Sequence, residues 1–180
     1  MDLEHKFCQL GSDVTVTDGA LIEGYASLFG KTDQGGDVVQ KGAYGASLSK
    51  INAKGGNIKM LWQHDPAQPI GIWDEVREDS KGLWVKGRIL TDVEKGREAA
   101  ALINAGAIDG LSIGYRTVKA TKNDKGNRLL SELELWEVSL VTFPMLPDAR
   151  VDAKGVDPEV ETMRDLAAAF ENARSLLAIR

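Results

Sequence analysis

The sequence predicts an α+β fold made mainly of β-strands and ending in a C-terminal amphipathic helix. Between residues 21 and 143 the dominant hydrophobic period is two, as in half-buried strands, and two short stretches of helical spacing interrupt it. After a boundary rich in Pro, Asp and Gly, apolar residues recur at helical spacing to the end of the chain. We therefore expect one domain at 1–151, followed by a linker and helix at 152–180.

The first half of the alternating region predicts two strands separated by a loop and a short helix. The expected elements are a strand at 21–29, a loop at 31–37, a short helix at 43–50 and a strand at 57–64. Pro66 and Pro69 are expected to stop the second strand, because proline has no N–H to donate to a sheet.

The second half predicts two pairs of strands. Residues 70–78 and 82–90 form a hairpin around the polar turn DSKG, and residues 111–121 and 128–143 flank the turn NDKGN. The last of these strands greatly exceeds the usual length of about 5–6 residues, so we expect it to bend, bulge or wrap around a barrel.

A helix is predicted between these two pairs. Thr91 and Glu94 have the spacing of a capping box, and the helix is expected to end at Gly106. Its expected apolar face consists of Val93, Ala99, Ala100, Leu102 and Ile103.

Composition excludes several classes of site. The chain has two histidines, His5 and His64, and one cysteine, Cys8, whereas a structural zinc site needs about four such ligands. A catalytic zinc site would need carboxylate ligands. We expect no metal and no cofactor, and a single cysteine fits a reducing compartment. A net charge of −5 without a basic stripe argues against nucleic acid as the primary ligand. No secretory signal or membrane-spanning run is recognisable, so the chain is expected to be soluble and cytoplasmic.

Familiar catalytic motifs are missing from the sequence. It contains no GxSxG elbow, no GxGxxG, no P-loop and no HExxH. The tryptophans all lie in expected strands, where indole rings more commonly pack than bind a ligand; they are Trp62, Trp73, Trp84 and Trp136.

Two residues are the best candidates for general base and nucleophile. His64 ends an expected strand next to a proline-rich turn that could present its imidazole to a cleft, although a structural histidine would look the same. Ser112, in DGLSIGY, shares a strand face with Gly114, which would leave room for a substrate backbone to approach. An ordinary strand serine is the alternative.

A third candidate is Glu137, in the otherwise apolar run WEVSLVTF. A carboxylate in such surroundings is costly unless it is paired, and an imidazole N–H would be a suitable partner. By contrast, Glu132 and Glu134 alternate with leucines, as on a solvated strand face.

Five blocks of sequence, in this order, resemble the prohead protease family of tailed phages. They are GYASLFGKTDQGGDVVQKGAY, LWQHDPAQPIGIWDEVRE, GLWVKGRIL, LINAGAIDGLSIGYRT and LWEVSLVTFPMLPDA. The resemblance implies a serine endopeptidase built on a small, mostly antiparallel β-barrel surrounded by helices, similar to herpesvirus assemblin. It also implies that His64 is the base and Ser112 the nucleophile. The block LWEVSLVTFPMLPDA holds no histidine that could orient the base. We therefore assign Glu137 to this role, with Ser139 and Asp109 as fallbacks.

The family resemblance also implies a biological setting. The expected substrate is the scaffolding segment of the major capsid protein, cleaved inside the prohead in the host cytoplasm, together with self-cleavage. We expect a homodimer or a larger self-association. Independently of the resemblance, an amphipathic helix after a flexible linker at 152–180 leads us to expect that this helix serves packaging or dimer contact. The alternatives are a catalytically idle assembly module of the same fold and a carbohydrate- or peptide-binding β-barrel that uses the tryptophans.

Overall fold

The computed structural model describes residues 4–9, 15–17 and 21–142. The helix expected within 152–180 lies outside these residues. The strands are β1 (Glu4–Gln9), β2 (Thr15–Thr17), β3 (Leu21–Leu28), β4 (Asp37–Val39), β5 (Lys59–Trp62), β6 (Asp65–Glu78), β7 (Gly82–Ile89), β8 (Gly110–Lys122) and β9 (Arg128–Val141), and the helices are α1 (Gly45–Ala53) and α2 (Glu94–Asn104).

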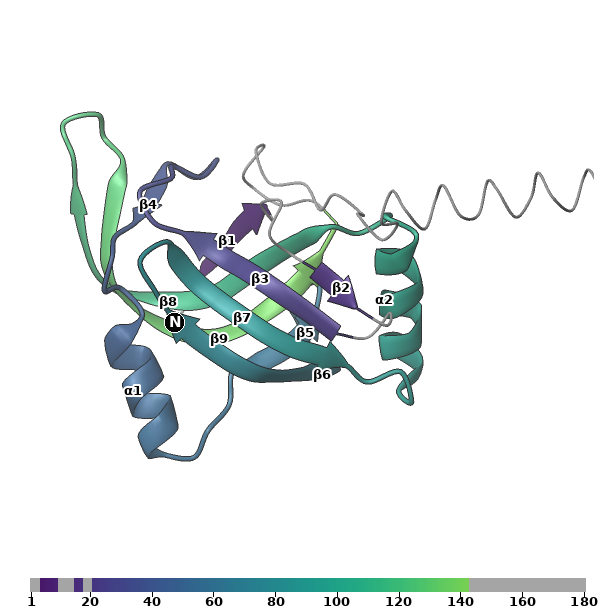
Figure 1. Ribbon diagram of the computed structural model, residues 1–180. Coiled ribbons are helices and arrows are strands. Elements are labelled where there is room, and N and C mark those ends of the chain that lie inside the picture. Colours follow the sequence, from purple (N-terminus) through teal and green to yellow (C-terminus); the bar gives the residue numbers. More distant parts are fainter. Residues whose placement is uncertain (1–3, 10–14, 18–20, 143–180) are drawn as a thin grey trace, which may run out of the picture.

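All nine described strands belong to one curled sheet (Figure 1). Its order is β1-β8-β9-β5-β6-β7-β3-β2, and β4 pairs with β9 away from this path. Strands β4 and β5 run parallel to β9, and the other pairs are antiparallel. The curling brings β3 into contact with β8 and with β1. The two helices lie at opposite ends of the sheet (Figure 1), so the predicted α+β class is confirmed.

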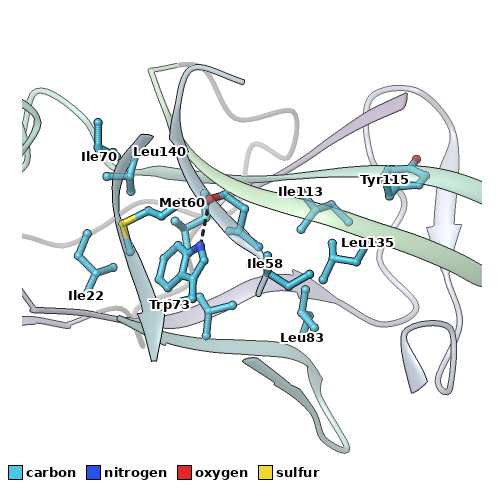
Figure 2. Packing of buried hydrophobic residues seen from close by; sticks show 14 of the residues in the cluster. Ile22, Ile58, Met60, Ile70, Trp73, Leu83, Ile113, Tyr115, Leu135 and Leu140 are labelled. Atoms are coloured by element: carbon cyan, nitrogen blue, oxygen red, sulfur yellow. Dashed lines mark hydrogen bonds between the residues drawn. The ribbon is translucent and has the colours of Figure 1, made fainter. Parts of the chain in front are cut away.

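The core fills the inside of this curl (Figure 2). Strands β5, β7, β8 and β9 supply it with Met60, Leu83, Ile113 and Leu140, as their period-two pattern predicts. Trp73 of β6 is also buried, and its Nε1–H donates a hydrogen bond of 3.1 Å to the carbonyl of Val138. This bond, dashed in Figure 2, connects β6 to the backbone of β9 across the core.

The expectation that Pro66 and Pro69 stop a strand is wrong. Both lie within β6, which starts directly after the turn that follows β5. Pairing between β6 and β7 begins only at Gly71. The prolines therefore occupy a stretch of β6 with a partner strand on one side, where a missing N–H is tolerated. The neighbouring register with β5 is irregular between Met60 and Trp62.

The capping box predicted for α2 is also absent. The N-cap is Val93, with no side-chain hydrogen bond, and Thr91 lies outside the helix. A Cβ on Gly96 would lie 2.1 Å from the carbonyl oxygen of Leu90, so the first turn packs directly against the end of β7. This tertiary contact overrides the local sequence signal. The expected buried face is right for Ala99, Ala100 and Ile103, whereas Val93 and Leu102 are exposed.

The long strands β8 and β9 contain irregularities, as their length predicted. Their register shifts between Gly114 and Tyr115 and again between Thr117 and Ala120. Strand β4 lies in the region between expected elements and was missed, because its three residues are too few to establish a period.

The turn between β6 and β7 is stabilised by Asp79. Its carboxylate accepts hydrogen bonds from the Tyr25 hydroxyl at 2.7 Å and from the N–H groups of Lys81 at 2.7 Å and Gly82 at 3.1 Å. Arg77 adds an ion pair of 3.0 Å. Burial alone would raise the pKa of Asp79, but these bonds outweigh it and hold the pKa below its ordinary value.

We predict that replacing Asp79 by alanine lowers the free energy of unfolding by about 1–3 kcal/mol at neutral pH. Because the pKa of Asp79 is lower in the folded chain, its stabilising effect is present above the ordinary Asp pKa and is lost as the pH falls through the folded value. Urea unfolding of both proteins from pH 7 to pH 3 measures this. A stability difference that stays constant across that range would contradict the prediction.

Candidate active site

His64 lies in a two-residue turn between β5 and β6. Trp62 pairs with Asp65, and the two residues between them, Gln63 and His64, have φ values of 51° and 62°. Two positive φ values are typical of a type I′ hairpin turn, which normally takes Asn and Gly. Backbone strain of this kind persists only where the surrounding structure enforces it, and it is concentrated at functional sites.

Strand β9 and the residue after it hold this turn in place. The N–H of Gln63 donates to the carbonyl of Leu140 at 2.9 Å, and the N–H of His64 donates to Ser139 Oγ at 3.2 Å. The side-chain amide of Gln63 also donates, from Nε2, to the hydroxyl of Thr142 at 2.6 Å. These bonds fix the position of the His64 backbone relative to β9.

The imidazole of His64 contacts the carboxylate of Glu137. Nδ1 lies 2.5 Å from Oε1, and the two side chains are only 11% and 8% exposed. The second carboxylate oxygen, Oε2, accepts a hydrogen bond of 2.5 Å from the Ser139 hydroxyl. Glu137 therefore has the imidazole partner that its apolar sequence context required.

The third candidate, Ser112, comes from the neighbouring strand β8. The antiparallel register places Ser112 directly opposite Ser139 and Gly114 directly opposite Glu137. Residues that face each other in this way have their side chains on the same face of the sheet, with Cβ atoms about 4.5–5.5 Å apart. Ser112 is fully buried. The fold thus gathers Ser112, Ser139, Glu137 and His64 where β5, β8 and β9 meet.

One detail of the site differs from what the sequence suggested. The space beside Gly114, expected to admit a substrate backbone, holds the carboxylate of Glu137: a Cβ on this glycine would lie 2.1 Å from Oε1.

The two fallback residues lie in different places. Asp109 lies just before β8, and within the described part of the chain the carboxylate against the imidazole is that of Glu137. Ser139 contacts Glu137 and the backbone of His64.

Glu134 is partly buried and paired, so it does not lie on a freely solvated strand face. Its carboxylate contacts Lys50 at 3.2 Å and also forms an ion pair with Arg116. The hydrogen bond from Lys50 is the main cause of a lowered pKa for Glu134, and the charge of Arg116 adds to it. Glu134 lies on β9 and Arg116 on β8, beyond the register shift that follows Gly114, and Lys50 reaches them from α1.

The tryptophans differ in their surroundings. Trp73 belongs to the core, and Trp84 packs edge-to-face on Tyr25 with ring centroids 4.9 Å apart. Trp136 is 49% exposed and lines a groove of about 410 Å³ between α1, the start of β5 and β9. The other lining residues are Ser47, Lys50, Ile51, Lys54, Gly56, Asn57, Ile58, Lys59, Glu134 and Leu135. Trp62 is partly buried and packs against the core. Three of the four tryptophans therefore pack against other residues of the sheet or core, and Trp136 borders an open groove.

Metal-binding clusters and membrane-spanning helices are both absent from the residues that the structure describes. In that part of the chain no group of three or more His, Cys, Asp or Glu side chains is arranged to hold a metal ion. Neither of the two described helices is long and apolar enough to cross a membrane.

Comparisons with known proteins show the family to which the chain belongs. Residues 10–165 match the family model described as caudovirus prohead serine protease. The chain is 33% identical over 150 residues to the prohead protease of Enterobacteria phage HK97, covering 81% of this chain and 65% of that protein. It is 29% identical over 131 residues to the prohead protease of Escherichia phage T5, covering 71% of this chain and 60% of the relative. The chain thus spans less than two thirds of the length of these relatives.

Two further similarities are to a much longer relative and to a solved structure. The chain is 32% identical over 122 residues to the capsid polyprotein of Pseudomonas phage PAJU2, covering 61% of this chain and 18% of that protein. The solved capsid assembly protease of bacteriophage T4 has a similar fold, with a TM-score of 0.63 and 19% identity, covering 79% of this chain and 98% of that one. With the family model matched over most of its length, the chain belongs to the caudovirus prohead serine protease family.

Proposed function

We propose that this chain is a serine endopeptidase that cleaves the scaffolding segment of a major capsid protein during phage capsid maturation. The single observation that best supports it is the buried His64–Glu137 pair. Glu137 lies on β9, which is paired with the strand β8 that carries Ser112. Buried titratable pairs beside a hydroxyl are typical of nucleophilic catalysis. The family match and the relatives named prohead protease and capsid polyprotein support the substrate.

The proposed mechanism assigns one role to each residue. Glu137 engages Nδ1 of His64, so the proton of Ser112 would be accepted at Nε2 as the serine oxygen attacks the peptide carbonyl. His64 then returns that proton to the leaving amine, and a water molecule releases the acyl group by the same route. Throughout, the negative charge of Glu137 stabilises the imidazolium and fixes the tautomer that keeps Nε2 as the acceptor.

The finer parts of the proposal concern fold and setting. The curled sheet supports a barrel similar to that of herpesvirus assemblin, within a protease domain at 1–151. We place the enzyme inside the assembling prohead in the host cytoplasm. There it would self-associate and cleave itself as well as the capsid protein, with the helix at 152–180 as the packaging or dimer contact.

Co-expression with the major capsid protein of the same phage tests the proposal. We expect the capsid protein to lose a terminal segment only when the protease is present, and a serine-directed phosphonate to block this and to modify Ser112, as mapped by mass spectrometry. An uncleaved capsid protein, together with no labelling of Ser112 in a folded protease, would favour the idle assembly module instead. Binding of soluble glycans that Trp136→Ala abolishes would favour the carbohydrate-binding alternative.

A further inference from the structure

Both oxygens of the Glu137 carboxylate are held by this chain. Oε1 faces Nδ1 of His64, and Oε2 accepts the hydroxyl proton of Ser139. The same Ser139 oxygen accepts the N–H of His64, which lies in the strained turn. The fully buried hydroxyl of Ser139 therefore contacts both the Glu137 carboxylate and the backbone N–H of His64.

A glycine completes the surroundings of this carboxylate. An ideal Cβ on Gly114 would lie 2.1 Å from Oε1, 2.8 Å from Cδ and 2.9 Å from Cγ of Glu137. The φ of Gly114 is outside the left-handed region, so its backbone conformation does not itself require glycine. What requires glycine here is the space that the Glu137 side chain occupies.

We propose that Gly114 and Ser139, which we call the carboxylate cradle, are positioning residues for the reaction. Gly114 provides the space and Ser139 the hydrogen bond that hold Glu137 in the one orientation that contacts Nδ1. Through this contact the cradle fixes the tautomer and ring position of His64, and through the His64 N–H it supports the turn. This inference rests on the proposed function.

The expected size of the effect follows from how closely catalytic groups must be placed. A displacement of about 1 Å in a reacting group can reduce the rate about 10²-fold. The distances at Gly114 are all shorter than carbon–oxygen or carbon–carbon contacts allow, so a methyl group must push the carboxylate away from its present position. The displaced atoms are the flexible end of a side chain, so the backbone can remain where it is.

The first test replaces Gly114 by alanine. We expect kcat for cleavage of the capsid protein to fall about 10²-fold, with KM within about twofold of wild type; the variant should remain folded, with a lower melting temperature because a buried carboxylate is moved from its partner. Gly45→Ala is the matched control, since an added Cβ there meets nothing within 4 Å, and it should leave kcat unchanged. Wild-type kcat in folded Gly114→Ala would overturn the role of Gly114.

The second test removes the hydroxyl of Ser139. We expect Ser139→Ala to lower kcat about tenfold or more, because Oε2 of Glu137 loses its hydroxyl donor, and Ser139→Thr to restore part of the loss by supplying a hydroxyl again. Ser27→Ala is the control, because Ser27 is an equally buried strand serine whose hydroxyl makes no hydrogen bond. Unchanged kcat in folded Ser139→Ala would overturn the role of Ser139.

A double-mutant cycle separates positioning from a general structural role. If Ser139 acts through Glu137, Ser139→Ala should change kcat by less than about twofold when Glu137 is already alanine. Independent, multiplicative losses would contradict the cradle. The imidazole Nδ1–H proton, followed by proton NMR in the resting enzyme, gives a readout without substrate: its strongly deshielded resonance should move upfield or broaden in Gly114→Ala and Ser139→Ala.

Ser112→Ala distinguishes failure of this inference from failure of the proposed function. Full activity in Ser112→Ala would refute the assigned chemistry itself. If Ser112→Ala is inactive while Gly114→Ala and Ser139→Ala are fully active with an unmoved Nδ1–H resonance, the chemistry stands and the cradle is wrong.

Discussion

Replacing Ser112 by alanine is expected to abolish processing of the capsid protein, with kcat reduced by about 10⁶-fold. The substitution removes only the oxygen that would attack the peptide carbonyl. Ser139 lies directly opposite, but its hydroxyl already donates to Glu137. Cleavage during co-expression, followed by gel electrophoresis and mass spectrometry, measures the loss.

His64→Ala should be as inactive as Ser112→Ala, because nucleophile and base act as a unit and their losses do not add. Circular dichroism must show that both variants are folded, and Ser27→Ala should process the capsid protein at the wild-type rate. Persistent cleavage by folded Ser112→Ala would remove Ser112 from the mechanism.

Local sequence patterns were sufficient for much of the fold. The period of two located β3, β7, β8 and β9, and the turn DSKG located the hairpin of β6 and β7. Errors arose where tertiary contacts outweigh local preference. Pro66 and Pro69 remain in β6 because one side of the strand is unpaired there, and α2 begins where Gly96 packs against the end of β7.

The residues of the candidate site could be selected from the sequence, but their arrangement could not. Glu137 stands out because a lone carboxylate in an apolar run needs a partner, and His64 was one of few imidazoles available. The parts played by Gly114 and Ser139 depend on the exact register of β8 against β9 and on the pairing of β9 with β5, which lies much earlier in the chain. Alternation places Gly114 on the face of Ser112 but does not reveal which side chain fills the space beside it.

Replacing Glu137 should reduce activity strongly, but less than replacing Ser112. In Glu137→Gln the amide keeps the shape of the carboxylate and can still accept the Nδ1–H, but the negative charge that faces the imidazolium is gone. The amide can also turn its NH₂ group toward Nδ1 and favour the wrong tautomer, and such a replacement of a triad carboxylate lowers kcat about 10⁴-fold. Glu137→Ala also releases the ring position of His64, so we expect its loss to be at least as large.

The order of these variants is the decisive measurement. Single-turnover cleavage should rank activity as wild type, Glu137→Gln, Glu137→Ala and then Ser112→Ala, because nucleophile and base survive in both Glu137 variants. Thermal unfolding provides the control: Glu137→Gln leaves no buried charge behind and should remain folded. If folded Glu137→Gln were as inactive as Ser112→Ala, orienting the base would not account for the whole loss of activity. Glu137 would then have to take part in proton transfer itself.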